Sequence, residues 1–553
     1  MARQLLGMGK GKIIGCSLGS CVHVAGVANF LALARECGWD TVFLGPAQSP
    51  AQVLQAVKEH DPDMVALSYR LTPETGREVI AELKRLIEAA GETGRRYAFG
   101  GTSPVCQVAR QSGLFEAVFN GSDGPEAVLK WLGGSEALRA QEPSADTLLG
   151  RIQAKAPYPL LRHHFGRPSV EETVEGARLI AEAGVLDVLS LGPDQNAQES
   201  FFRPQEMAPG EDGAGGVPVR TAEDLRRIYQ ATRCGNRPLL RCYSGTRDLL
   251  PWARMSVETI RQAWGAIPLC WYNVLDGRSD RVPAQSIAEN QEAMCWYAQR
   301  GLPVEVNEAH QWSLRGAHDA LAVATAYLAA CNAKQMGVQT YVAQYMVNTP
   351  PQTSPAMDLG KMLAKRELIE SLCDDGFSVL CQVRAGLTHF RPEPDLAKGQ
   401  LAAATALGLA LEPQIVHVVG YSEADHAATA EEVIESCGIA HGVLADLLEG
   451  LPDLTADPQV QQRRRELVAE ARVILRALPQ YARAGVADPP ADAETLAACI
   501  RVGLLDAPHL QPSAHCRGQL RTRMVKGACL AWDEATSRPL GEAERIARLP
   551  GAA

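Results

Sequence analysis

The chain has 553 residues, more than a single hydrophobic core usually holds, so we expect two or more domains. Its formal net charge of −10 argues against nucleic acid or an anionic membrane surface as the main partner. The sequence has no apolar run near the roughly 20 residues that span a bilayer, and its start lacks the apolar core of a secretory signal. We therefore expect a cytoplasmic protein. The 15 cysteines form no CxxC pair, which favours buried thiols over a cysteine-based metal site.

Residues 1–135 alternate short β-rich runs with amphipathic helical segments. The strands are predicted at residues 12–18, 41–45, 63–69, 96–101 and 117–121, with clear helical patterns at 49–60 and 74–91. This alternation predicts a flavodoxin-like, doubly wound parallel sheet. Ligands bind such sheets at the carboxyl ends of the strands. Three distinctive segments, GSCVHVAG, LSYRLTP and FGGTSP, follow strands at that edge.

A second alternation begins after residues 136–152, which are mostly polar, show no apolar periodicity and are predicted to be a linker. Residues 153–445 contain eight strand candidates, each followed by a helix-like segment: 158–164, 185–192, 238–245, 267–273, 302–308, 338–345, 377–386 and 414–420. Eight such units predict a (β/α)8 TIM barrel with a site at the carboxyl ends of its strands. Residues 446–553 are predicted to form a C-terminal extension of helical and mixed structure.

The three segments of the first domain carry six residues in a recognisable order. These are Cys21, His23 and Gly26 after the first strand, Ser68 at the end of the third, and Gly100 and Gly101 at the end of the fourth. The order resembles the cobalamin-binding domain of corrinoid enzymes, in which the motifs are Asp-x-His-x-x-Gly, a serine and a glycine pair. The resemblance implies cobalamin as cofactor, with His23 as the lower axial ligand of cobalt. It also implies that the serine and glycines line a slot for the nucleotide tail, because small residues let the backbone approach closely.

Two positions depart from that pattern. Cys21 stands where the family has the carboxylate that accepts the second imidazole proton, and a thiol is a weaker acceptor. Arg70 stands where many members have a leucine. The alternative for His23 is a turn histidine in a flavodoxin-like domain that binds no cobalt.

The barrel segments resemble, in collinear order, the catalytic subunit of glutamate mutase, an adenosylcobalamin-dependent radical isomerase. The segments that carry the resemblance are PLLRCYSGTRDLL, WYNVLDG, GLPVEVNEAHQWSLRG, GVQTYVAQYMVN and, in the tail, RVGLLDAPHLQPSAHCRGQLRTRMVKG. The resemblance implies adenosylcobalamin and a closed cavity in which arginines hold a carboxylate substrate.

Two residues of the barrel are implied to be catalytic. Arg241 matches one arginine of the family's three-arginine claw around the substrate carboxylates, and Glu308 aligns with the carboxylate that contacts the substrate amine. Gln198 and Glu292 fall at the other two claw positions, so glutamate is disfavoured as substrate. The alternatives are an ion pair at the barrel end for Arg241, and pairing with Arg315 or helix capping for Glu308. Further strand-end candidates to line the pocket are His310, Asn273, Gln344, Tyr345, Asn348 and Arg384.

Three functions remain open at this point. The first is a cobalamin-dependent carbon-skeleton isomerase acting on a small carboxylic or amino acid other than glutamate. The second is a corrinoid methyltransferase, which would be compatible with the changed claw and with the segment 421–439, which lacks the lysine that contacts the adenosyl ribose in the family. The third is a non-catalytic corrinoid-binding protein. The fusion of both parts in one chain is also compatible with a homodimer in which the cobalamin domain of one chain caps either barrel.

Overall fold

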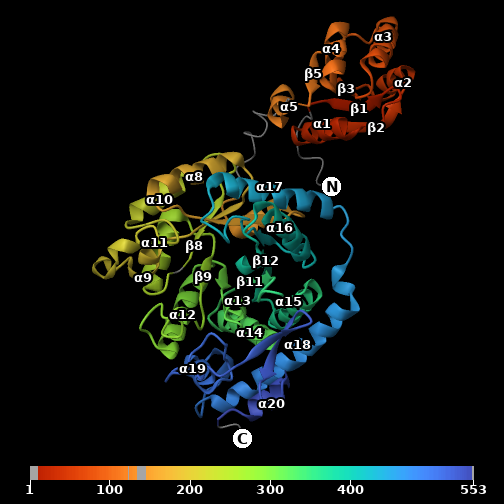
Figure 1. Cartoon of the computed structure of the whole chain (residues 1–553). Coiled ribbons are helices and arrows are strands. Elements are labelled where there is room, and N and C mark those ends of the chain that lie inside the picture. The colour runs from red at the N-terminus through yellow and green to blue at the C-terminus, as the bar shows by residue number, and fades with distance from the viewer. Residues whose placement is uncertain (1–9, 122–123, 134–144, 244, 551–553) are drawn as a thin grey trace. The chain divides into compact units, whose positions relative to one another are not determined.

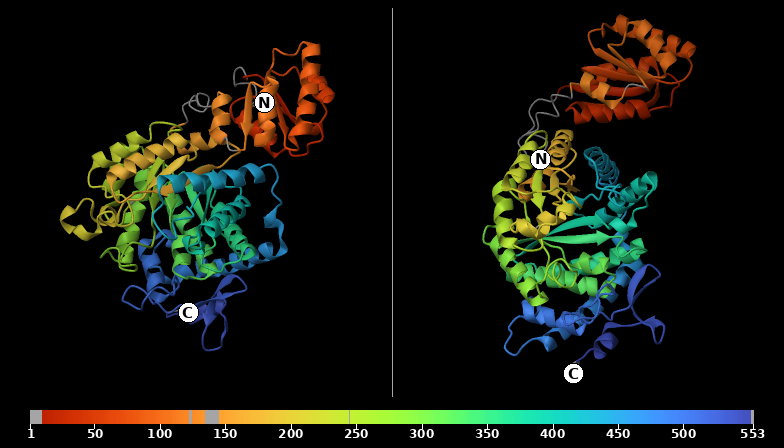
Figure 2. Two further views of the ribbon diagram at one scale, coloured as in Figure 1. Left: turned by 45° about the horizontal axis from the view of Figure 1, so that its top comes forward. Right: turned by 60° about the vertical axis from the view of Figure 1, so that its left-hand side comes forward.

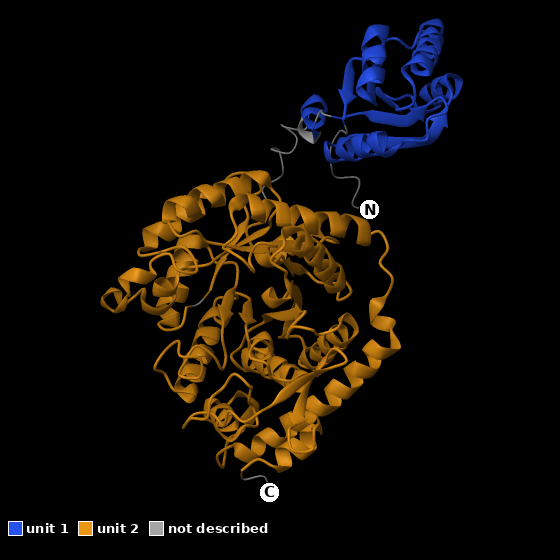
Figure 3. Ribbon diagram, in the orientation of Figure 1, with its two compact units in different colours: residues 1–142 blue, residues 143–553 orange. Residues whose placement is uncertain are grey.

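The structure is a computed structural model that describes residues 10–121, 124–133, 145–243 and 245–550. It divides into two compact units, Met1–Glu142 and Pro143–Ala553 (Figure 3). Part of the predicted linker, residues 136–144, lies outside the described residues. Its last residues lie in a helix, α7 (Leu148–Lys155), which begins after Thr147 because the Thr147 side chain accepts a hydrogen bond from the Gly150 amide.

The first unit is a five-stranded parallel sheet in the order β2-β1-β3-β4-β5, with helices on both faces (Figure 1). Its elements are β1 (Lys12–Leu18), α1 (Ala25–Glu36), β2 (Asp40–Gln48), α2 (Pro50–His60), β3 (Met64–Tyr69), α3 (Pro73–Ala90), β4 (Arg96–Gly101), α4 (Ser103–Ser112), β5 (Ala117–Asn120) and α5 (Pro125–Trp131). Adjacent residues of one strand enter different cores: Ile13 packs with Val27 of α1, whereas Ile14 packs with Val53 of α2. The predicted doubly wound sheet is confirmed.

The second unit contains an eight-stranded parallel sheet that curls into a barrel ringed by helices (Figure 2). The strands are β6 (Leu160–Phe165), β7 (Val188–Leu191), β8 (Leu239–Cys242), β9 (Gly265–Ile267), β10 (Val304–Val306), β11 (Thr340–Val347), β12 (Ser378–Ala385) and β13 (Ile415–His417). The helices are α8 (Val170–Ala183), α9 (Gln195–Ser200), α10 (Ala222–Ala231), α11 (Leu249–Ile260), α12 (Pro283–Ala298), α13 (Ala309–Leu314), α14 (Asp319–Gln335), α15 (Pro355–Glu370), α16 (Pro394–Leu409) and α17 (Ala430–Leu447), with short 3-10 turns η2 (Pro204–Glu206), η3 (Pro209–Glu211) and η4 (Leu387–His389).

The barrel is nearly closed. The strands pair in the order β8-β7-β6-β13-β12-β11-β10-β9, and the two end strands meet where the Ala263 amide donates to the Leu240 carbonyl at 2.9 Å. The predicted barrel fold is therefore confirmed, but the fourth strand is displaced from its predicted position at 267–273 and ends at Ile267. The reason is that the Leu269 and Cys270 amides donate to the buried Glu308 carboxylate instead of to a neighbouring strand.

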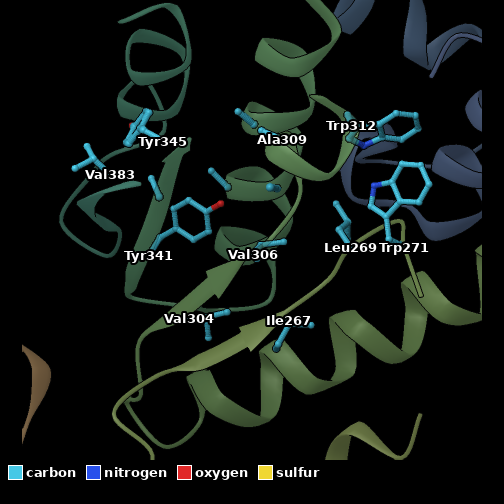
Figure 4. Packing of buried hydrophobic residues seen from close by; sticks show 14 of the residues in the cluster. Ile267, Leu269, Trp271, Val304, Val306, Ala309, Trp312, Tyr341, Tyr345 and Val383 are labelled. Atoms are coloured by element: carbon cyan, nitrogen blue, oxygen red, sulfur yellow. The ribbon is translucent and has the colours of Figure 1, made fainter. Parts of the chain in front are cut away.

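Side chains fill the barrel interior in layers. The lower layer is apolar and includes Leu160, Val188 and Trp264, together with Leu148 and Ile152 of α7. Another apolar cluster, outside the interior, holds Trp271 and Trp312, whose rings meet edge to face with centroids 4.7 Å apart (Figure 4). The layers above this lower apolar layer are polar, which is unusual for the interior of a barrel.

The C-terminal extension is part of the barrel's unit. It contains η5 (Leu454–Ala456), α18 (Pro458–Ala477), η6 (Leu478–Tyr481), η7 (Pro489–Ala491), α19 (Ala493–Val502), β14 (Thr522–Val525), β15 (Ala528–Asp533), β16 (Arg538–Pro539) and α20 (Glu542–Ala547). The buried carboxylate of Asp319 on α14 accepts from Arg463 of α18 at 2.8 Å and from the Cys529 amide of β15 at 3.0 Å. None of the described helices is long and apolar enough to cross a membrane.

Candidate functional site

A cavity of about 680 Å³ opens at the carboxyl edge of the first unit's sheet, between α1 and the ends of β3, β4 and β5. It is lined by His23, Gly26, Val27, Asn29, Phe30, Leu33, Ala66, Leu67, Ser68, Arg70, Ala98, Phe99, Gly100, Gly101, Thr102, Ser103, Phe119, Asn120, Gly121 and Val128. Five of the six predicted cofactor residues lie on this cavity; the sixth, Cys21, is fully buried behind His23. The walls are mostly apolar, as the slot for a flat aromatic group requires.

The absence of a side chain has a different consequence at each of the cavity's glycines. A Cβ atom at Gly26 or Gly100 would meet no atom within 4 Å, so these positions leave free space inside the cavity. At Gly101 a Cβ would lie 2.5 Å from the Tyr69 carbonyl oxygen, so that glycine is needed for the approach of β3 and β4. The first two therefore serve the cavity and the third serves the sheet that forms it.

The turn that carries His23 is fixed by hydrogen bonds, although the imidazole itself is exposed. Ser17 donates its hydroxyl to the Cys21 carbonyl, and the Ser68 hydroxyl donates to the His23 carbonyl at 3.4 Å. Cys21 Sγ lies 3.6 Å from His23 Nδ1. Because Nδ1 faces the thiol, Nε2 is the nitrogen that remains for a metal.

These features fit cobalamin. An exposed imidazole nitrogen is a suitable lower ligand for cobalt, and the adjacent apolar cavity has unfilled space at its two open glycines. Val22 and Leu71, whose side chains are 64% and 39% exposed, flank His23 and Arg70 in the sequence and offer apolar surface that a macrocycle would cover.

In the second unit, two arginines share one carboxylate inside the barrel. Arg162 of β6 and Arg241 of β8 lie 3.1 Å and 3.2 Å from Glu305 Oε2, and the Trp264 indole donates to the same oxygen at 2.7 Å. All four side chains are buried. Burial raises the pKa of Glu305, but Arg241, Arg162 and Trp264 outweigh it and hold the pKa at about 2. Glu305 is therefore ionised at neutral pH.

The two arginines differ in how their donors are used. Arg162 also donates to the Ser190 hydroxyl, to Gln382 and toward His164. Arg241 makes one side-chain hydrogen bond, to Glu305, and its buried Nε and Nη1 have no hydrogen-bond partner among the described residues. The second oxygen of Glu305, Oε1, is also buried and accepts from no described residue. Arg241 thus lies inside the barrel, deeper than the strand-end position at the mouth that the sequence predicted.

The Glu308 carboxylate accepts hydrogen bonds that hold a loop and a helix of the barrel in place. Its Oε2 accepts from the Leu269 and Cys270 amides, both at 3.1 Å, and its Oε1 accepts from the Trp312 indole at 2.6 Å. Neither predicted alternative occurs, because Arg315 pairs with Asp276 and the Glu308 side chain makes no capping hydrogen bond. These three hydrogen bonds leave about one of the carboxylate's acceptor positions for a substrate amine.

Above this network, Arg384 of β12 lies in register with His417 of β13, which lies in register with Arg162. The imidazoles of His164 and His417 stack with centroids 4.7 Å apart. Burial, and then the charges of neighbouring arginines, lower the pKa of both histidines well below the ordinary value, so both are neutral. Of the other predicted pocket residues, Gln344 and Asn348 are buried and each has an amide oxygen without a partner.

Sequence reasoning missed Arg162, Glu305 and the stacked histidines. Glu305 stands between two valines in VEV, and Arg162 follows two leucines in LLRHHF. That pattern is a usable signal, because a charge inside a barrel strand must find a partner on another strand.

Comparison with known proteins supports the interpretation of the first unit as a cobalamin-binding domain. Residues 11–129 match the family model of the B12 binding domain. No curated protein matches the chain. A cobalamin-binding protein from Desulfitobacterium hafniense is 23% identical over 22% of this chain and 59% of its own, with a TM-score of 0.20. The methanol:cobalamin methyltransferase complex from Methanosarcina barkeri is 22% identical over 24% of this chain and 50% of that one, with a TM-score of 0.21.

A cobalamin-dependent S-adenosylmethionine radical enzyme covers more of the chain, 78% against 56% of its own, but at 9% identity and a TM-score of 0.17. These TM-scores are too low to relate the barrel to any of the three structures. The similarity of the barrel to glutamate mutase stays a prediction. The chain carries an N-terminal B12-binding domain, followed by a nearly closed parallel barrel with a mixed C-terminal extension.

Proposed function

We propose that the protein is a cobalamin-dependent carbon-skeleton isomerase whose barrel binds a small carboxylic or amino acid. The observation that carries this proposal is the arrangement of unpaired groups at Arg241 and Glu305. Within the part of the chain that the structure describes, two buried guanidinium donors and one buried carboxylate oxygen have no partner there. Leaving such groups unsatisfied costs roughly 1–3 kcal/mol each or more, so the arrangement favours a ligand that supplies acceptors and a donor.

The residues have separate tasks in this proposal. His23 binds cobalt through Nε2 while Cys21 and Ser68 hold its turn, and the cavity with Gly26 and Gly100 receives the nucleotide tail. When adenosylcobalamin is bound, it supplies radical chemistry. Arg241 offers Nε and Nη1, which lie on opposite edges of the guanidinium, as two separate donors to acceptor groups of a substrate.

Around Arg241 the barrel supplies position rather than proton transfer. Glu305 fixes the orientation of the guanidinium through the third nitrogen, Nη2. Neutral His164 and His417 add no charge that the substrate must balance. The apolar layer closed by α7 lies beneath the polar layers, so the site is shielded from that end.

Anaerobic EPR of the full-length, adenosylcobalamin-loaded protein with candidate acids tests the proposal. Substrate-dependent coupled cobalt(II) and organic-radical signals are expected. A cobalt(I) state with methyl transfer would assign the protein to the methyltransferases, and a protein that binds cobalamin but gives neither would be a corrinoid-binding protein without catalysis.

Glutamate is the informative control substrate. Gln198 and Glu292, the residues at two predicted claw positions, are a partly exposed helix residue and an exposed one. We therefore expect no conversion of glutamate to methylaspartate, and measurable conversion would contradict the substrate assignment.

A further inference from the structure

The upper barrel contains a positive charge that the structure does not neutralise. Arg384 is partly buried, and its one hydrogen bond runs from Nε to the neighbouring Ala385 carbonyl at 3.2 Å. Within the described residues no carboxylate lies within ion-pair distance of its guanidinium. Two acidic groups act on Arg384 from beyond that distance: Glu423, whose Oε1 accepts from the Gly420 amide and lies 3.3 Å from His163 Nε2, and Glu305, which Arg162 and Arg241 already share.

The side chains beside Arg384 on the next strand, β13, carry no negative charge. Its register neighbour on β13 is His417, which is 3% exposed and has a buried Nδ1 that finds no partner among residues 10–121, 124–133, 145–243 and 245–550. His417 stacks on His164, and both are neutral. An arginine stays protonated even where burial disfavours its charge, so an anion beside this partly buried guanidinium would compensate a charge that is only partly solvated.

We propose that Arg384 and His417 form an oxyanion-binding subsite in the upper barrel, distinct from the Arg241 position, that holds a carboxylate or phosphate group. Arg384 supplies its two Nη groups, and His417 supplies Nδ1–H as a further donor in that tautomer. Arg384 of β12 thus supplies a positive charge that the residues at the predicted claw positions, Gln198 and Glu292, do not provide. As an anion site the proposal stands alone; as a site for the second anionic group of a substrate it rests on the proposed function.

Direct binding to the full-length protein tests the subsite without any turnover. Inorganic phosphate, butyrate and glutarate are titrated by calorimetry in a buffer without oxyanions. We expect phosphate to bind, and Arg384→Gln to weaken it by tenfold or more. Arg391→Gln is the matched control, because Arg391 is exposed and pairs with Glu393 on the surface. Equal phosphate affinity in wild type and Arg384→Gln would overturn the proposal.

Two further measurements test the subsite if the variant does not fold and identify the kind of anion that it binds. If Arg384→Gln does not fold, imidazole NMR of the wild type replaces it: phosphate should shift the ring resonances of His417, and no shift would overturn the subsite. A glutarate affinity at least tenfold above that of butyrate, lost in Arg384→Gln, assigns the subsite to a second group of the substrate. Phosphate binding without that difference assigns it to a phosphate or phosphorylated ligand. Arg384-dependent binding in a protein that gives no EPR signal would leave the subsite standing while the isomerase proposal fails.

Discussion

Two buried lysines one turn apart on α15 should respond in opposite ways to the same substitution. Lys361 Nζ lies 3.0 Å from Asp358 and 3.3 Å from Asp319, and it donates to the Thr349 carbonyl at 2.6 Å. Lys365 is 1% exposed and has no hydrogen bond or ion pair with any described residue. Burial, and then the charge of Lys361, lower the pKa of Lys365 to about 7.

The magnitude follows from that depression. Each unit of pKa shift corresponds to about 1.4 kcal/mol, so a charged Lys365 costs roughly 4–5 kcal/mol relative to a solvated lysine. Between pH 7 and the unfolded pKa near 10.5 the unfolded chain binds the extra proton, so stability rises with pH across this window. Below pH 7 both states are protonated and the full cost is present.

Lys365→Met should therefore raise the unfolding temperature of the barrel's unit at pH 6.5 and reduce the rise in stability between pH 7 and 10. Its gain is about 1–4 kcal/mol, the range seen when apolar residues replace buried charges. Lys361→Met leaves the buried carboxylates of Asp319 and Asp358 without their lysine and should cost roughly 3–5 kcal/mol. Differential scanning calorimetry of the intact protein measures both. If Lys365→Met destabilises as much as Lys361→Met, the unpaired lysine is not a source of instability and the reasoning is wrong.

Three predictions concern the cofactor and substrate sites. His23→Ala should abolish the nitrogen superhyperfine splitting in the EPR spectrum of the cobalt(II) form prepared with nitrogen-15 histidine, whereas His60→Ala should retain it; identical spectra would exclude histidine ligation by His23. Gly100→Leu should lower cobalamin affinity at least tenfold in equilibrium dialysis without unfolding the unit, because its Cβ has open space and its side chain fills the cavity. Once a substrate is known, Arg241→Lys should lower kcat/KM by tenfold or more, about 1.4 kcal/mol, with cobalamin affinity unchanged; loss of the cofactor or of folding would make Arg241 a structural residue.

The fold was predictable because local periodicity determines it. Alternating strand and amphipathic helix patterns predicted both sheets, and the resemblance of three strand-end segments to cobalamin-binding motifs predicted five of the residues that line the cavity. The fourth barrel strand was misplaced because IPLCWYN has strong β propensity, whereas a distant carboxylate, Glu308, captures the Leu269 and Cys270 amides. A hydrogen bond between residues so far apart leaves no local trace in the sequence.

The barrel site was predictable only in part, because resemblance to a family identifies single positions and does not show which side chains hydrogen-bond or form ion pairs with one another. Alignment selected Arg241 and Glu308. It could not reveal that the Glu308 carboxylate already accepts hydrogen bonds from the Leu269 and Cys270 amides and from the Trp312 indole. Nor could it show that Glu305, three residues earlier, keeps a free oxygen beside Arg241.

Charges inside the barrel strands connect the sequence to the site by another route. Arg162, Arg241 and Glu305 each occupy an inward position directly after an apolar residue of their strand. An isolated charge there would be too costly to keep, so charges of opposite sign on different strands must meet. Two arginines against one glutamate leave a positive excess, and Arg384 increases it. Since neither His164 nor His417 can offset that charge, the balance of the interior itself favours an anionic ligand, whichever reaction the cofactor supports.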